Sequence, residues 1–360
     1  MDIGVPKEVK NQEFRVGLTP SSVSYLSQQG HRVFVEKSLG SEIGFSDKSY
    51  ADSGAIICED PEDLYSKSTL IIKVKEPVEN EIPLIRDDHI LFTFLHLAGN
   101  PEIASKLKDT GVTAIAYETL TSDDGTLPLL SPMSEIAGQI SIVVGNYHLL
   151  KPYGGKGVLA NKIDNIEPRK ITILGAGVAG SNAIKGAIKL GADVTVLDLS
   201  QEKLDQLDMQ YQNNILTKLS NDHNILDAIC ESDIIIGSVY VTGKKAPIVI
   251  TKDMLKKIQP GTVLVDISID QGGCFESSKP TTHDEPTYLV DEILHYCVSN
   301  MPGAVPLTAS QALNYASLPY VNKLATIGIN KIFEDDIHFA NGLNLSNGEF
   351  THPSVIETLS

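Results

Sequence analysis

The fold is decided by Lys170-Ile171-Thr172-Ile173-Leu174-Gly175-Ala176-Gly177-Val178-Ala179-Gly180, an apolar strand that runs directly into a Gly-x-Gly-x-x-Gly turn. An amphipathic helix that extends to Leu190 follows the turn. The first glycine of this pattern allows a tight turn, the second lets backbone N–H groups approach a pyrophosphate, and the third lets the helix pack closely on the strand. The stretch therefore predicts the first βα unit of a Rossmann domain that binds a dinucleotide.

An acidic residue at the end of the next predicted strand, residues 193–197, bears on which dinucleotide binds. Asp198 follows the last glycine at about the 20-residue spacing of the ribose-binding acid in this motif. A carboxylate there can accept both ribose hydroxyls and repels a 2′-phosphate, so it predicts NAD rather than NADP. The alternative is a chance glycine cluster at a sharp turn, which the strand, the helix and the acid around it make the weaker interpretation.

Length and composition limit the class of protein. A chain of 360 residues exceeds the size of a single hydrophobic core, which predicts two domains of roughly 150 residues each. No apolar run approaches the roughly 20 residues of a membrane-spanning helix, and the residues from Met1 to Glu8 enter a strand-like segment without a targeting pattern. We therefore expect no membrane association and a cytoplasmic location.

Charge and cysteine usage exclude further classes. The formal net charge of -17 repels phosphate backbones, which argues against nucleic-acid binding and means that an anionic substrate needs local cations. The four cysteines, Cys58, Cys230, Cys274 and Cys297, form no Cys-x-x-Cys pair, so neither a disulfide framework nor a zinc ribbon is expected. No spacing of His, Asp and Glu indicates a metal site.

The pattern of apolar runs predicts an α/β fold with two sheets. A helix capped by Thr19 and Pro20 and ended by Gly30 follows the first strand, and a long helix over residues 133–150 precedes a glycine-containing loop. A last apolar helix is expected near residues 310–332. Continuous apolar runs predict buried parallel strands; those of the first series are residues 3–5, 32–35, 70–74, 90–94 and 113–116, and those of the second 170–174, 193–197, 233–236 and 262–266.

Three residues near the ends of the first series have the charges that a substrate site needs. Arg15 precedes a helix and can clamp a carboxylate, Lys75 follows an apolar strand, and His96 follows another, where an imidazole can act as acid or base. Each has an ordinary alternative, namely a surface arginine, a solvated lysine cap and a core histidine. Their common position at strand ends favours the functional interpretation.

Two segments of the second series end in small or polar residues where a nicotinamide would lie. They are Ile236-Gly237-Ser238-Val239 and Asp266-Ile267-Ser268-Ile269-Asp270-Gln271-Gly272-Gly273. Asp270 is an acid-base candidate at that end, and a turn-forming aspartate before a glycine pair is an equally good interpretation.

Taken together, these segments resemble the family of alanine dehydrogenases and the NAD-binding subunit of proton-translocating transhydrogenase. The resemblance spans nearly the whole chain in order. It is carried by Ile3-Gly4-Val5-Pro6-Lys7-Glu8, Arg15-Val16-Gly17-Leu18-Thr19-Pro20, Lys73-Val74-Lys75-Glu76-Pro77, Leu95-His96-Leu97-Ala98, Ala116-Tyr117-Glu118-Thr119, Pro132-Met133-Ser134-Glu135-Ile136-Ala137-Gly138, Asp270-Gln271-Gly272-Gly273, Pro280-Thr281-Thr282-His283 and Asn300-Met301-Pro302-Gly303-Ala304-Val305-Pro306.

The resemblance implies a fold of two domains joined by long helices. A flavodoxin- or Rossmann-like substrate domain comprises residues 1–130 and is completed by a C-terminal helical part, residues 305–360. Residues 131–304 form the Rossmann NAD-binding domain, and the active cleft lies between the two domains. The resemblance also implies a homohexamer.

Residue roles carried over from the family assign Arg15 and Lys75 to the substrate's carboxylate and oxo group, and His96 and Asp270 to acid-base chemistry. Cofactor contacts are implied for the glycine turn and for Ser134, Asp198, Lys203, Ser220, Val239, Tyr240, Ile267, Ser268, Ile269, Asp270, Lys279, Val298, Ser299, Asn300 and Met301. Lys203, Lys279 and Leu307 stand where arginine is usual in the family. The two lysines keep the positive charge but lose the bidentate geometry of arginine, and Leu307 lacks its polar contact. Residues 160–163 replace a more glycine-rich loop.

The activity implied is reversible oxidative deamination of L-alanine to pyruvate and ammonium, as in L-alanine catabolism. Glyoxylate and 2-oxobutyrate stay open as competing substrates, since one methylene in a small pocket is worth only about 1 to 3 kcal/mol. Two other functions stay open. One is a transhydrogenase-type module that exchanges hydride with a partner-bound nicotinamide, and the other is an NAD-binding protein without turnover.

Overall fold

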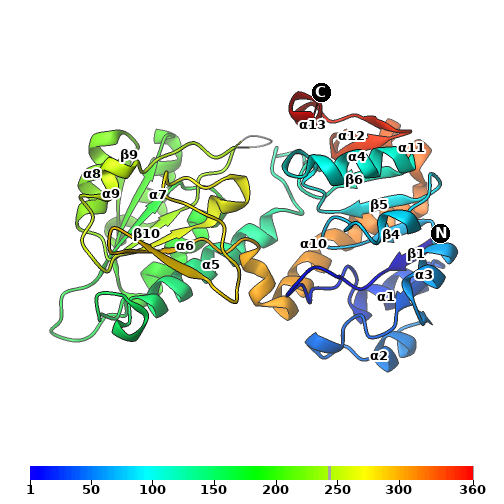
Figure 1. Cartoon of the computed structure of the whole chain (residues 1–360), viewed down its shortest axis with the longest axis horizontal. Coiled ribbons are helices and arrows are strands. Elements are labelled where there is room, and N and C mark those ends of the chain that lie inside the picture. The colour runs from blue at the N-terminus through cyan, green and yellow to red at the C-terminus, as the bar shows by residue number, and fades with distance from the viewer. Residues whose placement is uncertain (242–244, 360) are drawn as a thin grey trace. The chain divides into compact units, whose positions relative to one another are not determined.

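The computed structural model describes residues 1–241 and 245–359, and the chain divides into two compact units. Unit 1 comprises Met1–Met133 and Val305–Ser360, and unit 2 comprises Ser134–Ala304. Each unit has its own central sheet with helices packed against it (Figure 1). The predicted two-sheet α/β fold is therefore confirmed. In the described part of the chain, no helix has the length and apolarity needed to span a membrane.

Unit 2 is built on a seven-stranded sheet in the order β12-β13-β11-β10-β7-β8-β9. All neighbouring pairs are parallel except β12 and β13. The strands are β7 (Lys170–Leu174), β8 (Asp193–Asp198), β9 (Ile215–Leu219), β10 (Ile234–Gly237), β11 (Val263–Asp266), β12 (Thr287–Val290) and β13 (Ile293–Tyr296). The helices are α5 (Ser131–His148), which begins in unit 1, α6 (Val178–Leu190), α7 (Gln201–Tyr211), α8 (Asp222–Cys230) and α9 (Lys252–Leu255), with short 3₁₀ turns at η4 (Lys151–Tyr153), η5 (Gln212–Asn214), η6 (Ile267–Gln271) and η7 (Met301–Ala304).

Unit 1 repeats this strand order. Its sheet runs β15-β14-β6-β5-β4-β1-β2-β3, and only the edge strands β14 and β15 are antiparallel. The strands are β1 (Asp2–Val5), β2 (Arg32–Glu36), β3 (Ala55–Cys58), β4 (Leu70–Ile72), β5 (Ile90–Thr93), β6 (Thr113–Ala116), β14 (Leu343–Ser346) and β15 (Glu349–Phe350). The helices are α1 (Pro20–Gln28), α2 (Asp47–Asp52), α3 (Pro61–Lys67), α4 (Pro101–Thr110), α10 (Pro306–Ile327), α11 (Ile329–Asp335), α12 (Ile337–Gly342) and α13 (Pro353–Leu359), with 3₁₀ turns η1 (Ser41–Ile43), η2 (Ile82–Leu84) and η3 (Leu97–Gly99).

The predicted strands and helices agree with the structure within one to two residues at most ends, because continuous apolar runs bury both faces of these parallel strands. The expectation of one helix over residues 310–332 is wrong. Gly328 has φ of +83°, which lies outside the helical region. The helix therefore stops before Gly328, and a separate helix, α11, begins after it. The sequence analysis also missed β3, β9, β12, β13, β14 and β15. Most residues of β3, β9 and β12 are partly or fully exposed, whereas β13 is buried and His295 interrupts its apolar run.

Close backbone contacts at glycines hold α5, α6 and β7 together. A Cβ at Gly180 would lie 1.9 Å from the carbonyl oxygen of Gly175, and a Cβ at Gly138 would lie 2.2 Å from that of Ala179. Both distances are far below van der Waals contact, so only glycine lets the start of α6 approach β7 and α5 this closely.

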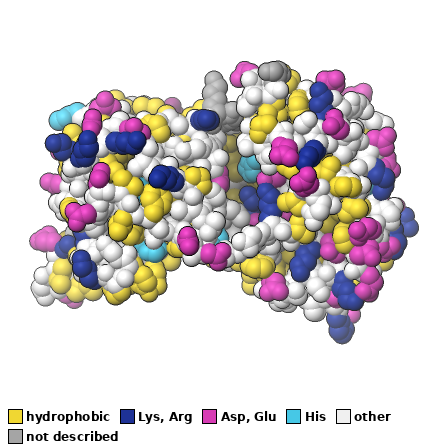
Figure 2. Space-filling model, in the orientation of Figure 1, with side chains coloured by type: hydrophobic (Ala, Val, Ile, Leu, Met, Phe, Trp, Pro, Cys, Tyr) yellow, Lys and Arg dark blue, Asp and Glu magenta, His cyan; other side chains and the backbone are white. Residues whose placement is uncertain are grey.

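The outer surface carries both signs of charge. Acidic and basic side chains are interspersed on the visible face of each unit, with hydrophobic side chains scattered between them (Figure 2). The large negative charge of the chain is therefore spread over the surface and does not form one acidic face in this view.

We expect Gly138→Ala to destabilise unit 2 by about 1–3 kcal/mol, because the backbone oxygen of Ala179 cannot move away from the added methyl group. Gly186→Ala on α6 is the matched control, since the nearest atom there, at 3.0 Å, belongs to the flexible side chain of Ile142. Urea unfolding of both variants measures the difference. Equal losses of unfolding free energy in the two variants would show that the close contact between Gly138 and Ala179 does not exclude a side chain at position 138.

Because of the buried His148, we expect the free energy of unfolding to fall at acidic pH. Burial lowers the pKa of His148 below its usual value of 6.5, and its Nδ1 has no hydrogen-bond partner among the described residues. Just below pH 6.5 the unfolded chain therefore binds a proton that the folded chain does not, so the free energy of unfolding falls as the pH falls, by up to about 1.4 kcal/mol per pH unit.

Denaturant unfolding between pH 5 and 7 tests this, with His148→Leu compared with the wild type. In the variant, the slope of the unfolding free energy against pH should be smaller by about the contribution of one bound proton. Other buried histidines with lowered pKa values, such as His89 and His295, contribute equally to the slope in both proteins. The difference between the wild-type slope and the variant slope therefore reports His148. An unchanged slope would contradict the assignment to His148.

Candidate active site

The glycine turn lies at the point in the unit 2 sheet where the strand order reverses. Strands β9-β8-β7 run one way from this point and β10-β11-β13 the other, which is the 3-2-1-4-5-6 order of a Rossmann sheet. Gly175 has φ of +102°, and a Cβ there would lie 2.7 Å from the carbonyl oxygen of Ser238 at the end of β10. Ligands of such sheets bind in the crevice outside these two strand ends.

The first turn of α6 presents backbone donors to open space. A Cβ built on Gly177 meets no atom within 4 Å. The N–H groups of Val178 and Ala179 find no acceptor within the described ranges. An exposed helix N-terminus with unpaired N–H groups suits a pyrophosphate, which these donors and the helix dipole can bind.

Asp198 lies directly beside this turn, as the sequence pattern requires. Its Oδ2 accepts a hydrogen bond of 2.7 Å from the N–H of Ala176, and its Oδ1 accepts one of 2.9 Å from the N–H of Ser200. The carboxylate is thus held at the end of β8 by two backbone amides. Each carboxylate oxygen can accept more than one hydrogen bond, so acceptor positions remain for ribose hydroxyls.

Ser134 lies on the helix that packs against α6. Gly138 of α5 lies close to Ala179, and Ile142 lies close to Gly186, so α5 runs parallel to α6. Ser134 precedes Gly138 by one helical turn on the same face of α5, toward the end of α5 that lies nearest the start of α6.

The other predicted cofactor residues lie in the segments that follow strands of the unit 2 sheet. The backbone N–H of Ser220 donates to the carbonyl of Asp198, and Lys203 is exposed in the first turn of α7. The hydroxyl of Ser268 donates to the carbonyl of Val239 over 2.7 Å, which joins the loops after β10 and β11. Further candidates at or near these loops are Tyr240, Ile267, Ile269, Asp270, Lys279, Val298, Ser299, Asn300 and Met301.

Asp266 fixes the loop that carries Asp270. It is fully buried and accepts hydrogen bonds from the N–H groups of Ser268 and Cys274 and from the hydroxyl of Ser278. Burial raises the pKa of Asp266, and these donors oppose that rise. Asp270 itself is exposed four residues later, so the buried aspartate is structural and the exposed one is available for chemistry.

Unit 1 places its charged candidates at the equivalent edge of its own sheet. Strands β3-β2-β1 and β4-β5-β6 again diverge from one point, between β1 and β4. Arg15, Lys75 and His96 lie on the segments that follow β1, β4 and β5. The structure thus brings these three predicted residues to one end of one sheet, whereas Asp270 belongs to unit 2.

Arg15 is buried and bound by an acid of its own segment. Its Nε and Nη2 donate to the two carboxylate oxygens of Glu13 over 2.7 and 2.5 Å, and its Nη1 contacts the sulfur of Met133 at 3.2 Å. This bidentate pair orients the guanidinium and neutralises its charge inside the protein.

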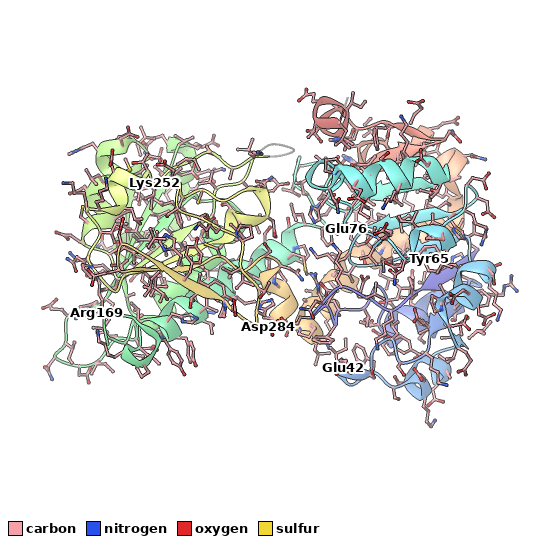
Figure 3. The ribbon with its side chains drawn as sticks, in the orientation of Figure 1. Glu42, Tyr65, Glu76, Arg169, Lys252 and Asp284 are labelled. Atoms are coloured by element: carbon pink, nitrogen blue, oxygen red, sulfur yellow. The ribbon has the colours of Figure 1, made fainter. Side chains whose placement is uncertain are left out.

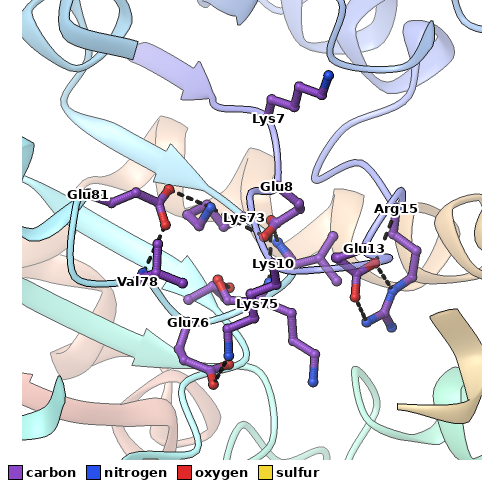
Figure 4. A network of polar contacts seen from close by, with 12 residues as sticks. Lys7, Glu8, Lys10, Glu13, Arg15, Lys73, Lys75, Glu76, Val78 and Glu81 are labelled. Carbon is purple, nitrogen blue, oxygen red and sulfur yellow. Dashed lines mark hydrogen bonds and ion pairs between the residues drawn. The ribbon is translucent and has the colours of Figure 1, made fainter. Parts of the chain in front are cut away.

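A buried ion network supports Lys75 (Figure 4). The amine of Lys73 lies 2.8 Å from Glu81 and 3.3 Å from Glu8, and all three side chains are at least nine-tenths buried. Desolvation would lower the pKa of Lys73, but the two carboxylates raise it, so Lys73 stays charged. Burial raises the pKa of Glu8, which accepts hydrogen bonds from the N–H groups of Val74 and Lys75.

The Lys75 amine makes no hydrogen bond or ion pair in the part of the chain that the structure describes. Its nearest strong electrostatic partner is Glu76, which lies in unit 1 (Figure 3) and is paired with Lys10. Burial alone would raise the pKa of Glu76, but Lys75, Lys10 and His96 together hold it below its usual value. The amine of Lys75 is therefore a cation that can accept an anionic ligand.

His96 is exposed and its backbone is unusual. Its φ and ψ are +46° and +37°, in the left-handed region that residues with a side chain seldom adopt. Its N–H donates over 2.6 Å to Glu118 at the end of β6, and its Nδ1 lies 4.0 Å from the same carboxylate. The ring stacks parallel to Phe94 at 5.9 Å.

The acidic partners Glu8, Glu13, Glu76 and Glu118 were missed as functional residues by the sequence analysis. Glu8, Glu76 and Glu118 lie within the motifs that carry the family resemblance, and Glu13 lies two residues before one of them, but a glutamate next to a strand has no local pattern that separates it from a surface residue. Their roles depend on neighbours up to 66 residues away in the chain. Among the described residues, no three His, Cys, Asp or Glu side chains group to hold a metal ion.

Comparison with known families matches both halves of the chain. Residues 4–137 match the alanine dehydrogenase/PNT N-terminal domain, and residues 141–353 match the alanine dehydrogenase/PNT C-terminal domain. Alanine dehydrogenase of Halomonas elongata is 48% identical over 99% of this chain and 96% of its own length. That of Bacillus subtilis is 47% identical over 100% of this chain and 95% of its own length.

Solved structures show the same architecture. An L-alanine dehydrogenase structure is 45% identical, covers 99% of each chain and superposes with a TM-score of 0.95. A transhydrogenase from Sinorhizobium meliloti, 23% identical, covers 98% of this chain and 100% of its own with a TM-score of 0.82, which is a likeness of fold.

Proposed function

Because the chain belongs to the alanine dehydrogenase/PNT family, we propose that it catalyses reversible oxidative deamination of L-alanine with NAD: L-alanine, NAD⁺ and water give pyruvate, ammonium, NADH and a proton. The chain is an amino-acid dehydrogenase by its likeness to alanine dehydrogenases over nearly its full length, which is the observation that carries the proposal. The charged groups at the carboxyl edge of the unit 1 sheet supply what an amino-acid substrate needs.

Family and fold together imply a nicotinamide dinucleotide. When bound, its nicotinamide supplies the hydride acceptor for the α-hydrogen of alanine. The residues that would hold it fit such a group, because the unpaired N–H groups at the start of α6 suit the pyrophosphate and Asp198 suits an unphosphorylated ribose.

The substrate residues divide the chemistry among them. Arg15, oriented by Glu13, binds the carboxylate, and the amine of Lys75 polarises the substrate oxygen once the carbinolamine collapses to the ketone. The amine of alanine must be neutral before the α-hydrogen can leave as hydride. His96, exposed and stacked on Phe94, takes that proton, and Asp270 supports the acid-base steps.

The first test measures NADH oxidation after pyruvate and ammonium are added. Rapid oxidation that requires ammonium supports the proposal, and His96→Ala should lower kcat about 10²–10⁴-fold, the usual contribution of a general acid-base group. Glyoxylate and 2-oxobutyrate are run beside pyruvate to define the side-chain range.

Two results would overturn this function. Oxidation that is equal without ammonium would indicate a simple 2-oxo acid reductase. Tight NADH binding without turnover of any 2-oxo acid would indicate a binding protein.

Asp198 allows a test of cofactor choice. Asp198→Ala removes the carboxylate that would repel a 2′-phosphate, so we expect the preference for NADH over NADPH, measured as the ratio of kcat/KM values, to fall at least tenfold. Asp193→Ala, an exposed aspartate at the start of the same strand, is the control and should leave the ratio unchanged. A ratio unaffected by Asp198→Ala would remove this residue from cofactor selection.

The hexamer implied by the family resemblance and the cytoplasmic location expected from the sequence stay predictions. Light scattering of the purified chain gives its mass directly and checks the first.

A further inference from the structure

Glu118 lies where the backbone around His96 departs from the β5 strand. The N–H of Tyr117 donates to the carbonyl of Thr93, the last residue of β5, over 2.9 Å, which continues the β5–β6 ladder one residue past the end of β6. One residue later the ladder stops, and the carboxylate of Glu118 takes the place of a backbone acceptor.

Two successive amides converge on this carboxylate. The N–H of Leu95 lies 3.2 Å from both oxygens of Glu118, and the N–H of His96 lies 2.6 Å from Oε1. A left-handed residue turns consecutive N–H groups to one side, which forms a small anion-binding concavity. The side chain of Glu118 is only 14% exposed, and its carboxylate accepts hydrogen bonds from both amides.

The left-handed conformation of His96 has no local cause in its sequence. Neither the residue nor its neighbours are glycine, so the local sequence does not require a positive φ at His96. Leu95 and Leu97 on either side are buried at 1% and 2% exposure in the core that also contains Val355 of α13. Both leucines are buried, whereas the imidazole between them points outward at 42% exposure.

The ring is also held from the side. It stacks on Phe94 with an interplanar angle of 5°, and Phe94 in turn contacts the ring of Tyr117 edge-on at 5.1 Å. Its Nδ1 lies 4.0 Å from Glu118, too far for a hydrogen bond, and the ring makes no side-chain hydrogen bond within residues 1–241 and 245–359. The contact between Glu118 and His96 therefore acts mainly through the backbone.

We propose that Glu118 is a positioning residue, whose carboxylate holds the amides of Leu95 and His96 in the strained turn and so directs the imidazole outward to meet the substrate. This inference rests on the proposed function, in which His96 moves the proton of the substrate amine. Glu118 acts through His96 and does not itself touch the substrate.

The test compares Glu118→Ala and Glu118→Gln in the full-length protein. Glu118→Ala removes both acceptors, so kcat should fall at least 100-fold, while the Kd for NADH, measured by fluorescence, stays within twofold. Glu118→Gln keeps one carbonyl oxygen for the amides and should retain at least ten times the kcat of Glu118→Ala. Glu102→Ala, an exposed acid on α4, is the matched control and should keep full activity.

A double variant separates positioning from general damage to the fold. If Glu118 acts only through His96, Glu118→Ala should lower kcat no further in a His96→Ala background, since residues that act as a unit are non-additive. A further tenfold loss in that background, or full activity of Glu118→Ala, would overturn the proposal.

Hydrogen exchange tests the contact without any turnover. The N–H groups of Leu95 and His96 should exchange at least tenfold faster in Glu118→Ala than in the wild type, and the amides of β1 should not change. Unchanged exchange at Leu95 and His96 would overturn the positioning role even in an active enzyme. An inactive wild type with accelerated exchange in the variant would overturn the proposed function and leave the positioning contact supported.

Discussion

The close approach of backbone to backbone around the glycine turn is the constraint on which unit 2 depends. Position 180 has no room for a Cβ because the carbonyl oxygen of Gly175 would lie 1.9 Å away, and position 138 has none because of Ala179. These contacts bring α5 and β7 against the start of α6. The first N–H groups of α6 face open space at the strand-order reversal, beside Asp198.

Unit 1 has the same strand order, but its reversal point carries charged side chains in place of unpaired backbone N–H groups. At its reversal point the chain places its own carboxylates, and each one meets a cation or a backbone amide. Glu8 and Glu81 bind Lys73, Glu13 binds Arg15, and Glu118 binds the amides around His96. Two sheets of one topology thus differ in the charged groups at their ends.

Charge pairing also explains how a strongly acidic chain can keep cationic groups for a substrate. Buried cations without partners would be costly, so Lys73 and Arg15 each have a bound carboxylate. Lys75 remains the half-buried cation whose amine has no such partner in the described part of the chain. The net charge of the site is therefore decided by a few buried pairs and not by the total of -17.

The sequence by itself determined the features that depend on neighbouring residues: the continuous apolar runs of the parallel strands, the glycine turn with Asp198 after the next strand, and the candidates Arg15, Lys75 and His96 at strand ends. The break at Gly328 and the half-exposed edge strands escaped it, because a single positive φ or a short strand carries little local pattern. Only the tertiary structure decided which glutamate pairs with which backbone amide or cation. Val74 meets Glu8 from 66 residues away and His96 meets Glu118 from 22, and such pairings follow from the order of strands in the sheet, which brings distant chain segments to one edge.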